Sequence, residues 1–128
     1  MSAGPWPLRA YALSASPRIK LVPVGHTSNV FGGLGGTIPS VSSDLGGNGI
    51  VWAVGRPDNI QTEPLMLYAY DATHLGHTLF QSALEYWQNS GGTPFLTPTI
   101  IRGKVFVGAA DSVFVFGLAG SGTVRSER

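Results

Sequence analysis

The chain contains 128 residues, of which 43% are hydrophobic and only 12% are charged, and its formal net charge is +1. Its Lys and Arg residues are few and scattered, which argues against a nucleic-acid partner because phosphate binding requires clustered positive charge. The absence of cysteine excludes disulfides and thiolate metal sites, and no apolar run approaches the roughly 20 residues of a transmembrane helix.

The N-terminal part of the chain predicts two strands, a loop and a third strand. Leu8–Leu13 and Ile19–Val22 are short apolar segments, and a turn around Pro17 separates them. Residues 26–36 are rich in Gly and Ser and predict a loop. Thr37–Ser43 then predicts the third strand, which begins near a proline, a residue that suits the start of a strand.

The middle of the chain holds its most apolar segments. Ile50–Val54 and Leu65–Asp71 are rich in β-branched and aromatic residues and are too short for typical helices. The ten-residue polar connection Gly55–Pro64 separates them. Thr78–Ser82 follows as a more polar strand, as expected of an outer edge that faces solvent. Ala83–Asn89 is interpreted as a short helical turn.

The C-terminal part predicts a strand, a hairpin and a tail. Phe95–Ile101 is the predicted strand, and the hairpin joins residues 104–108 to residues 113–117. Arg102-Gly103 supplies a tight reversal before the hairpin. Ala119–Arg128 consists of small and charged residues and is predicted to be a disordered tail.

Two of these strands are apolar at consecutive positions, so they lack the alternation of a half-exposed strand. Ile50–Val54 and Val113–Phe116 therefore require cover on both faces, as between stacked layers. A radial stack of small sheets provides such cover, and that arrangement is a β-propeller. The predicted fold class is all-β, a partial β-propeller of about two four-stranded antiparallel blades.

A long internal repeat supports this interpretation. Ala10-Tyr11 matches Ala69-Tyr70, and Pro39–Val54 resembles Pro98–Gly108. The predicted organisation is then the third and fourth strands of one blade in residues 8–22, a full blade in residues 37–82, an incomplete last blade in residues 95–117 and the tail in residues 119–128.

About two blades would leave open apolar faces at both ends, because repeat units bury their faces only against neighbours. Two interpretations follow: the chain is the C-terminal part of a larger ring, or several chains associate to complete one. A third interpretation, an independent small β domain such as a sandwich, remains open. The expected partners are accordingly the remaining blades of a parent chain, or further copies of this one, with no nucleic acid and no membrane span.

Three segments resemble the repeat of the pyrroloquinoline quinone (PQQ)-like, or quinoprotein, β-propeller family. They are Gly49-Ile50-Val51-Trp52-Ala53, Leu67-Tyr68-Ala69-Tyr70-Asp71-Ala72 and the run Thr97–Gly108, which reads Thr-Pro-Thr-Ile-Ile-Arg-Gly-Lys-Val-Phe-Val-Gly. The resemblance covers roughly residues 8–118. It implies a β-propeller and a periplasmic or extracellular location. Met1–Ala15 is not a signal peptide, because prolines and an arginine interrupt any apolar core.

The chain also departs from the family's functional pattern. The cysteine pair that contacts the quinone in the alcohol dehydrogenases is absent, and the calcium ligands and catalytic Asp find no matching positions. Phe80 stands where the family's docking Trp would be. The resemblance therefore implies a non-catalytic structural or interaction scaffold, with no catalytic or metal-binding residue and no cofactor in this segment. PQQ and calcium are expected only in the alternative, a C-terminal piece of a PQQ-dependent dehydrogenase.

The aspartates and histidines are interpreted as turn or surface residues. Asp44, Asp71 and Asp111 follow or precede strands, where a carboxylate accepts backbone N–H groups in a turn. His26, His74 and His77 are interpreted as surface or turn residues, since a closed metal site needs three or four ligands with supporting contacts.

The glycine-rich segment, the serines and the tryptophans also have structural interpretations. Gly32–Gly36 lacks the following helix of a dinucleotide loop and is interpreted as a flexible connection. Ser40, Ser42, Ser43 and Ser112 have no nucleophile motif around them. Trp6, Trp52 and Trp87 are interpreted as packing anchors, with Trp87 also a possible exposed platform for sugar stacking. The loops Gly55–Pro64 and Ala83–Thr93 are the predicted contact loops, because connections carry function on such scaffolds.

Overall fold

The computed structural model describes residues 6–32, 36–57, 63–86, 96–119 and 123–127, and every regular element in these ranges is a strand. The chain is all-β, as the sequence predicts. The strands are β1 (Trp6–Ser14), β2 (Lys20–Phe31), β3 (Ser40–Ser42), β4 (Ile50–Gly55), β5 (Met66–Asp71), β6 (His74–Ala83), β7 (Thr99–Ile101), β8 (Lys104–Gly108), β9 (Val113–Ala119) and β10 (Thr123–Glu127).

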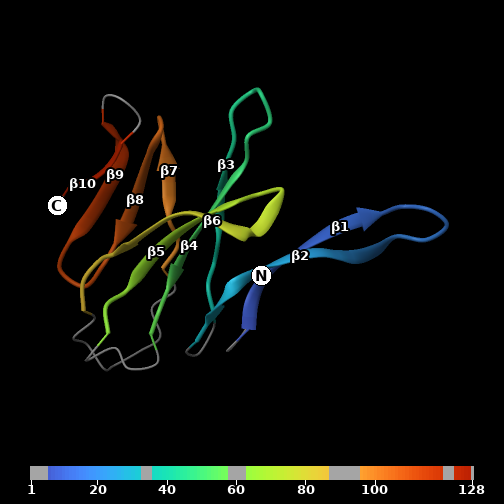
Figure 1. Cartoon of the computed structure of the whole chain (residues 1–128), viewed down its shortest axis with the longest axis horizontal. Coiled ribbons are helices and arrows are strands. Elements are labelled where there is room, and N and C mark those ends of the chain that lie inside the picture. The colour runs from blue at the N-terminus through green and yellow to red at the C-terminus, as the bar shows by residue number, and fades with distance from the viewer. Residues whose placement is uncertain (1–5, 33–35, 58–62, 87–95, 120–122, 128) are drawn as a thin grey trace.

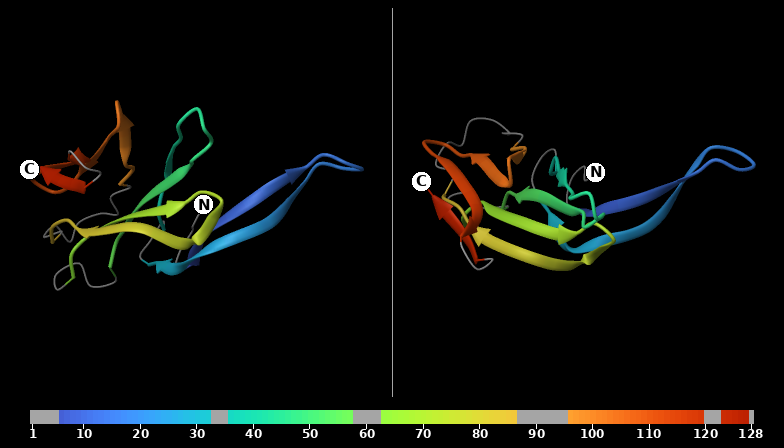
Figure 2. Two further views of the ribbon diagram at one scale, coloured as in Figure 1. Left: turned by 45° about the horizontal axis from the view of Figure 1, so that its top comes forward. Right: turned by 90° about the horizontal axis from the view of Figure 1, so that it is seen from above.

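The strands form three antiparallel layers (Figure 1). Strands β1 and β2 form a long hairpin, strands β3 to β6 form a four-stranded sheet in chain order (sheet 1), and strands β7 to β10 form a second one (sheet 2). In both sheets each strand pairs with the next along the chain, and no sheet among the described residues closes on itself. Figure 2 shows sheet 1 between the hairpin and sheet 2.

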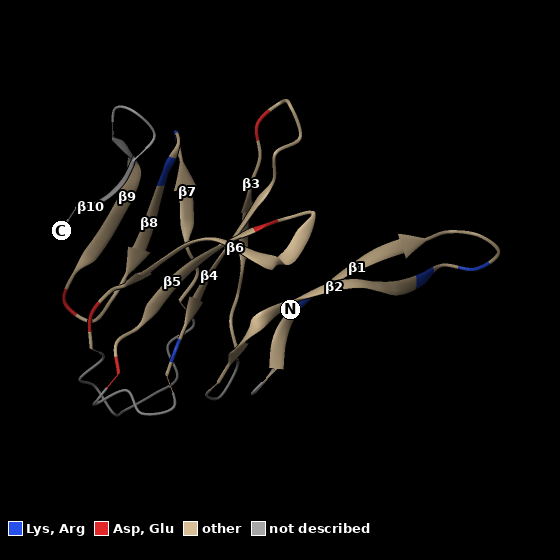
Figure 3. Ribbon diagram, viewed as in Figure 1, with Lys and Arg blue, Asp and Glu red and all other residues tan. Residues whose placement is uncertain are grey.

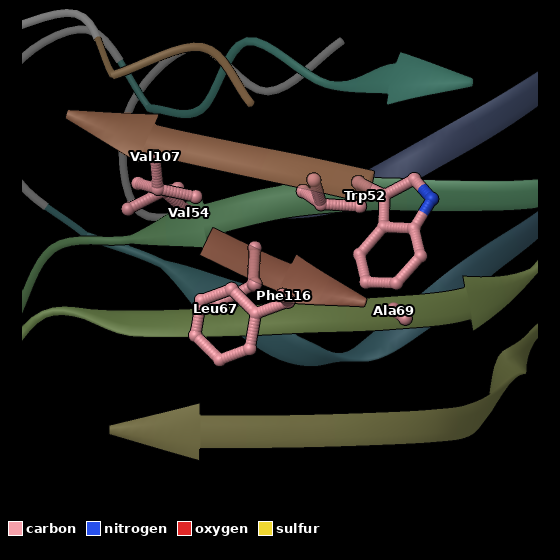
Figure 4. Packing of buried hydrophobic residues seen from close by; sticks show 7 residues of the cluster. Trp52, Val54, Leu67, Ala69, Val107 and Phe116 are labelled. Carbon is pink, nitrogen blue, oxygen red and sulfur yellow. The ribbon is translucent and has the colours of Figure 1, made fainter. Parts of the chain in front are cut away.

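One apolar core joins sheet 1 to sheet 2. Its buried side chains come from the middle strands of both sheets: Trp52, Val54, Leu67, Ala69, Val105, Val107 and Phe116 (Figure 4). The rings of Phe80 and Phe116 meet edge-on with centroids 5.8 Å apart, the arrangement that aromatic pairs prefer. At the edge strands, the Ser40 hydroxyl donates to the Pro98 carbonyl oxygen and links the two layers again.

A second core joins the other face of sheet 1 to the hairpin. Leu8 and Phe31 of the hairpin pack with Ala53, Tyr70 and Leu75 of sheet 1. The Tyr70 ring meets Phe31 edge-on and stacks on the Tyr68 ring, and its hydroxyl donates to Asn29 Oδ1 at 3.0 Å. Strand β4 is therefore covered on both faces, which confirms the prediction made from its continuous apolar run.

Strand β9 is covered on one face only among the described residues. Phe114 and Phe116 contribute to the core between the sheets, whereas Val113, on the opposite face, is 54% exposed. The prediction of cover on both faces of Val113–Phe116 is thus not met within this part of the chain. The physical reason is that sheet 2 is the last layer of the stack and has no described layer beyond it.

The turns follow the local sequence. Arg102 and Gly103 both have positive φ (49° and 73°) and connect β7 to β8 in a two-residue loop, the primed turn that matches strand twist. Between β3 and β4, the Asp44 carboxylate accepts the backbone N–H groups of Gly46 and Asn48. The tight reversals predicted at Arg102-Gly103 and near Asp44 are therefore present.

The hairpin is longer than predicted. Strand β2 continues through Phe31, although residues 26–36 were predicted to be a loop. Its Gly and Ser residues are accommodated because the strand pairs with β1 through two register irregularities, and Thr27 Oγ1 accepts the backbone N–H of Leu8. A bulged pairing removes the regular alternation on which strand prediction depends.

Two other predictions need correction. Strand β10 occupies Thr123–Glu127, inside the predicted disordered tail 119–128, and pairs with β9. An edge strand needs a partner on one side only, so a polar sequence with Thr and Val suffices. Strand β6 begins at His74, four residues before the predicted Thr78. The helical turn predicted at 83–89 is absent from its described part, 83–86, and the rest lies outside the described residues.

The register reveals a spatial repeat between the layers. Val51 pairs with Tyr70 in sheet 1 as Val105 pairs with Phe116 in sheet 2, so Leu67–Asp71 and Val113–Gly117 occupy equivalent positions. We call the face that carries Leu67 and Ala69, or their equivalents, the front face, and the opposite face the back face. The front face of sheet 1 packs on the back face of sheet 2.

The hairpin obeys the same rule. The sequence match of Ala10-Tyr11 with Ala69-Tyr70 makes Leu8 and Ala10 the equivalents of Leu67 and Ala69. Leu8 and Ala10 lie in the core between the hairpin and sheet 1, so the front face of the hairpin packs on the back face of sheet 1. The three layers are therefore stacked head to tail.

Candidate functional site

All three histidines of the chain line one cavity of about 490 Å³. The cavity lies between the hairpin and the turn that joins β5 to β6, and its lining is Ala10, Val24, Gly25, His26 and residues 72–77. The sequence indicates the pair His74 and His77 but gives no reason to place His26 beside them. The packing of β2 against β6, secured by a hydrogen bond from the Ser28 hydroxyl to the Gly76 carbonyl oxygen at 3.4 Å, brings them together.

The hydrogen bonds around the cavity fix which nitrogen of two imidazoles carries a proton. His26 Nδ1 lies 3.0 Å from the Thr27 carbonyl oxygen, which can only accept, so Nδ1 donates. The Thr73 hydroxyl donates to Asp71 Oδ1 at 2.6 Å, so His74 Nδ1, 3.2 Å from the same hydroxyl oxygen, must donate to it.

Asp71 anchors this series of hydrogen bonds. Its Oδ1 accepts the Thr73 hydroxyl and the Thr73 backbone N–H, the latter at 2.8 Å. These bonds, the side-chain one first, lower the pKa of the Asp71 carboxyl, and the neighbouring His74 adds a smaller contribution. Asp71 is thus a turn residue, as predicted, and it also orients a histidine that the cavity exposes.

The cavity brings imidazole nitrogens close to a hydroxyl that donates to a carboxylate. Among the described residues, no three His, Asp or Glu side chains are grouped so as to hold a metal ion. No hydroxyl nucleophile stands beside an imidazole base here, since the Thr73 hydroxyl donates to a carboxylate instead.

The other residues considered from the sequence are separate from this cavity. Trp52 is 9% exposed and lies in the core, where its Nε1 donates to Ser42 Oγ at 2.9 Å. Trp6 is 56% exposed, with the Arg9 guanidinium 5.8 Å from its ring centroid. The Ser112 hydroxyl donates to Glu85 Oε2 at 3.3 Å. Ser43 and Asp111 are exposed in turns.

Some predicted positions fall outside the described residues. They are Trp87, residues 33–35 of the Gly32–Gly36 segment, residues 58–62 of the first contact loop and residues 87–93 of the second. The described bases of the two contact loops lie side by side at one end of sheet 1, because Leu65 N–H donates to the Glu85 carbonyl oxygen and Leu84 N–H donates to the Leu65 carbonyl oxygen.

Two exposed apolar surfaces of the described residues lie at the two ends of the stack. At one end, the hairpin extends away from sheet 1 as an arm, Tyr11–Pro23 (Figures 1 and 2). Every residue of the arm except Ser14 is exposed. Leu13 and Leu21 pair across the arm and are 68% and 66% exposed.

At the other end lies the front face of sheet 2. Ile101 and Val113 there are 53% and 54% exposed, and Phe106 and Val115 beside them are half-buried. The register places these four side chains on one face of β7, β8 and β9. Figure 3 shows that the described charged residues lie mainly in turns and at strand ends. Arg18 and Lys20 belong to the arm, and Lys104 begins β8.

No helix among the described residues has the length and apolar character needed to cross a bilayer. Comparisons of the chain with models of protein families, with curated proteins and with solved structures found no match.

Proposed function

We propose that this chain is a non-catalytic repeat segment of a β-propeller of the PQQ-like type, and that it acts as a structural and interaction scaffold. The observation that carries the proposal is the head-to-tail stack, in which equivalent faces of successive layers make equivalent contacts. A propeller is built by such a rule, because each of its sheets packs on the next by one repeated rotation.

The strand order supports the same conclusion. Each four-stranded sheet pairs its strands in chain order, which is the connectivity of a propeller blade. The family resemblance lies on the strands that fill the cores: Leu67–Ala72 forms β5 and its turn, and Thr97–Gly108 includes β7 and β8. The apolar surfaces at the two ends are the contacts that further layers would use.

An extended chain tests the repeat. If residues 84–127 are duplicated after Glu127, the connection 84–98 again joins a fourth strand to a first strand, and the back face of the added sheet can cover the front face of sheet 2. We expect one cooperative unfolding transition at a higher midpoint than that of the single chain, because repeat stability grows with each new interface. The measurement is thermal and urea unfolding followed by circular dichroism.

The control carries the same duplication with Phe116 replaced by Asp in the added copy only, which places a charge in the new interface. It should return the midpoint to that of the single chain. A duplicated chain that unfolds at the single-chain midpoint, or in two separate transitions, would contradict the proposed repeat.

Quinone binding distinguishes the scaffold from a piece of a dehydrogenase. Titration of the chain with PQQ in the presence of Ca²⁺, monitored by quenching of tryptophan fluorescence, should give no saturable signal beyond that of free tryptophan. A dye-linked alcohol oxidation assay on the same samples should match the protein-free blank. Saturable binding at micromolar quinone would favour the dehydrogenase instead.

A further inference from the structure

The two internal interfaces leave one surface of each kind without a partner. The front face of the hairpin is covered at its base, where Leu8 and Ala10 pack on sheet 1, and the front face of sheet 1 is covered by sheet 2. The front face of sheet 2 has no such cover among the described residues. The back faces of sheets 1 and 2 are covered likewise, so the back face of the hairpin remains. A stack with one open front and one open back can bind a second copy of itself by the contact it already uses twice.

We propose that copies of this chain associate head to tail, with the back face of the arm (Tyr11–Pro23) of one copy seated on the front face of sheet 2 of the next. This inference rests on the layer equivalence of the proposed function and names the partner, a second copy. The following observations argue for that occupant.

The arm carries the residues that the contact requires. Its back face bears Tyr11, the equivalent of Tyr70 and Phe116, which are the aromatic residues that fill the two internal cores. Antiparallel register places Leu13, Leu21 and Pro23 on the same face as Tyr11, because directly paired residues share a face and alternate residues along a strand do so too. All of these side chains are exposed in the single chain.

The receiving surface matches in position and in size. Val113 and Val115 occupy the positions that Leu67 and Ala69 hold where sheet 1 receives sheet 2. A two-stranded layer can cover the middle strands of a four-stranded sheet, since the hairpin reduces Ala53 and Tyr70 on the back face of sheet 1 to 0% exposure. Val41, on the same face of the edge strand β3, stays 64% exposed.

The charges on the two surfaces exclude a mainly electrostatic contact. Among the side chains that the structure describes, the arm carries Arg18 and Lys20 near its tip and the front face of sheet 2 carries Lys104, so these charges have the same sign. Association should therefore be driven by apolar burial and should not weaken when salt is added, whereas an ion-paired interface would weaken through screening.

A contact between two different surfaces has a definite consequence for symmetry. It is heterologous, so addition of copies continues until a ring closes or an open assembly forms, and a dimer is not a natural end point. Two variants can stop this growth at opposite ends. Leu13→Lys blocks the arm, Val113→Lys blocks the front face of sheet 2, and both residues are exposed in the single chain, so each variant keeps its internal cores.

The test is sedimentation velocity with light scattering over a wide range of protein concentration. The wild-type chain should form species larger than a dimer. Each blocked variant alone should be monomeric, with association weakened at least about a hundredfold by burial of an unpaired ammonium group. An equimolar mixture of the two variants should form a one-to-one heterodimer and stop there, because one intact arm meets one intact front face.

Two further variants serve as a second block of the interface and as a control on the opposite face of the arm. Ile101→Lys is a second block on the front face of sheet 2 and should behave as Val113→Lys does, and Val22→Lys, on the opposite face of the arm, should associate like the wild type. Far-ultraviolet circular dichroism at low concentration verifies that each variant is folded. A monomeric wild-type chain, oligomers that survive either block, or blocked variants that do not recover a heterodimer would each overturn the inference. The duplicated chain tests the layer equivalence separately, so its result stands in any of these cases.

Discussion

Phe116→Ala should destabilise the chain by about 3–5 kcal/mol, the range observed when a large buried aromatic side chain is truncated in a core. Phe116 is 2% exposed, lies in the core between the two sheets and meets the Phe80 ring edge-on. Its removal leaves a cavity between two sheets. Strand pairing within each sheet restrains the backbone, so the surroundings cannot collapse fully into the cavity. Urea unfolding followed by circular dichroism, at a concentration where the chain is monomeric, measures the change.

The matched control lies on the same strand. Val113→Ala removes a side chain that is 54% exposed on the front face of β9, and it should change the free energy of unfolding of the monomer by no more than about 0.5 kcal/mol. Two substitutions three residues apart then report on opposite faces of one strand. If Phe116→Ala were as mild as Val113→Ala, the core between the sheets would not be the main contact that holds sheet 2 in place.

The strands that could be predicted are those whose local sequence decides the outcome. Ile50–Val54 is apolar at every position, so no arrangement satisfies it except burial on both faces, and β4 is buried in this way. Arg102-Gly103 was predictable for a different reason, since glycine readily adopts the positive φ of a two-residue turn. In both cases the residues themselves specify the structure without reference to distant parts of the chain.

The hairpin and the edge strands were less predictable because their structure depends on partners. Strand β2 contains Ser28 and Asn29, which lie in the predicted loop 26–36, yet pairing with β1 through bulges makes them part of a strand. Strand β10 follows from the free edge of β9 rather than from an apolar sequence. Edge and bulged strands carry a weak local signal, because backbone pairing, which most residues can supply, contributes to their stability.

The candidate sites also divide into those that the local sequence predicts and those that depend on the packing of distant strands. The Asp71 turn was predictable from residue type, since a carboxylate before a turn accepts nearby backbone N–H groups. The meeting of His26 with His74 and His77 was not, because it depends on the packing of β2 against β6. The sequence did carry a signal for the exposed apolar arm. Tyr11 and Leu13 are apolar at alternate positions of β1, although the opposite face of this strand packs on sheet 1 through Leu8 and Ala10.

Tyr70→Phe should make the chain less stable than the wild type at neutral pH and more stable at strongly alkaline pH. At neutral pH the variant loses the hydrogen bond to Asn29 Oδ1, which should cost about 0.5–1.5 kcal/mol. Burial, and after it the nearby Tyr68, raises the pKa of Tyr70 above the ordinary tyrosine value of 10.0. At pH values between the ordinary tyrosine pKa and the raised pKa of Tyr70, the unfolded chain has lost a proton that the folded chain retains.

The sign follows from that difference in bound protons. Above about pH 10 the unfolded state binds fewer protons than the folded state, so the free energy of unfolding of the wild type falls as the pH rises, by up to about 1.4 kcal/mol per pH unit for one tyrosine. The Tyr70→Phe variant has no hydroxyl at this position, so its free energy of unfolding does not fall for this reason. The two stability curves should therefore cross within about one pH unit above the ordinary tyrosine pKa.

Urea unfolding of both proteins at intervals between pH 7 and pH 12 measures the crossing. Burial also raises the pKa of Tyr68, so the double variant Tyr68→Phe/Tyr70→Phe should show a flatter alkaline limb than Tyr70→Phe alone. Tyr11→Phe is the control, since the Tyr11 side chain is 45% exposed on the arm and removal of its hydroxyl should leave the shape of the wild-type curve unchanged. Parallel curves for the wild type and Tyr70→Phe up to pH 12 would mean that the Tyr70 hydroxyl reaches water in the folded chain. The packing of the hairpin on sheet 1, which buries that hydroxyl, would then have to be looser than the contacts of Leu8 and Phe31 indicate.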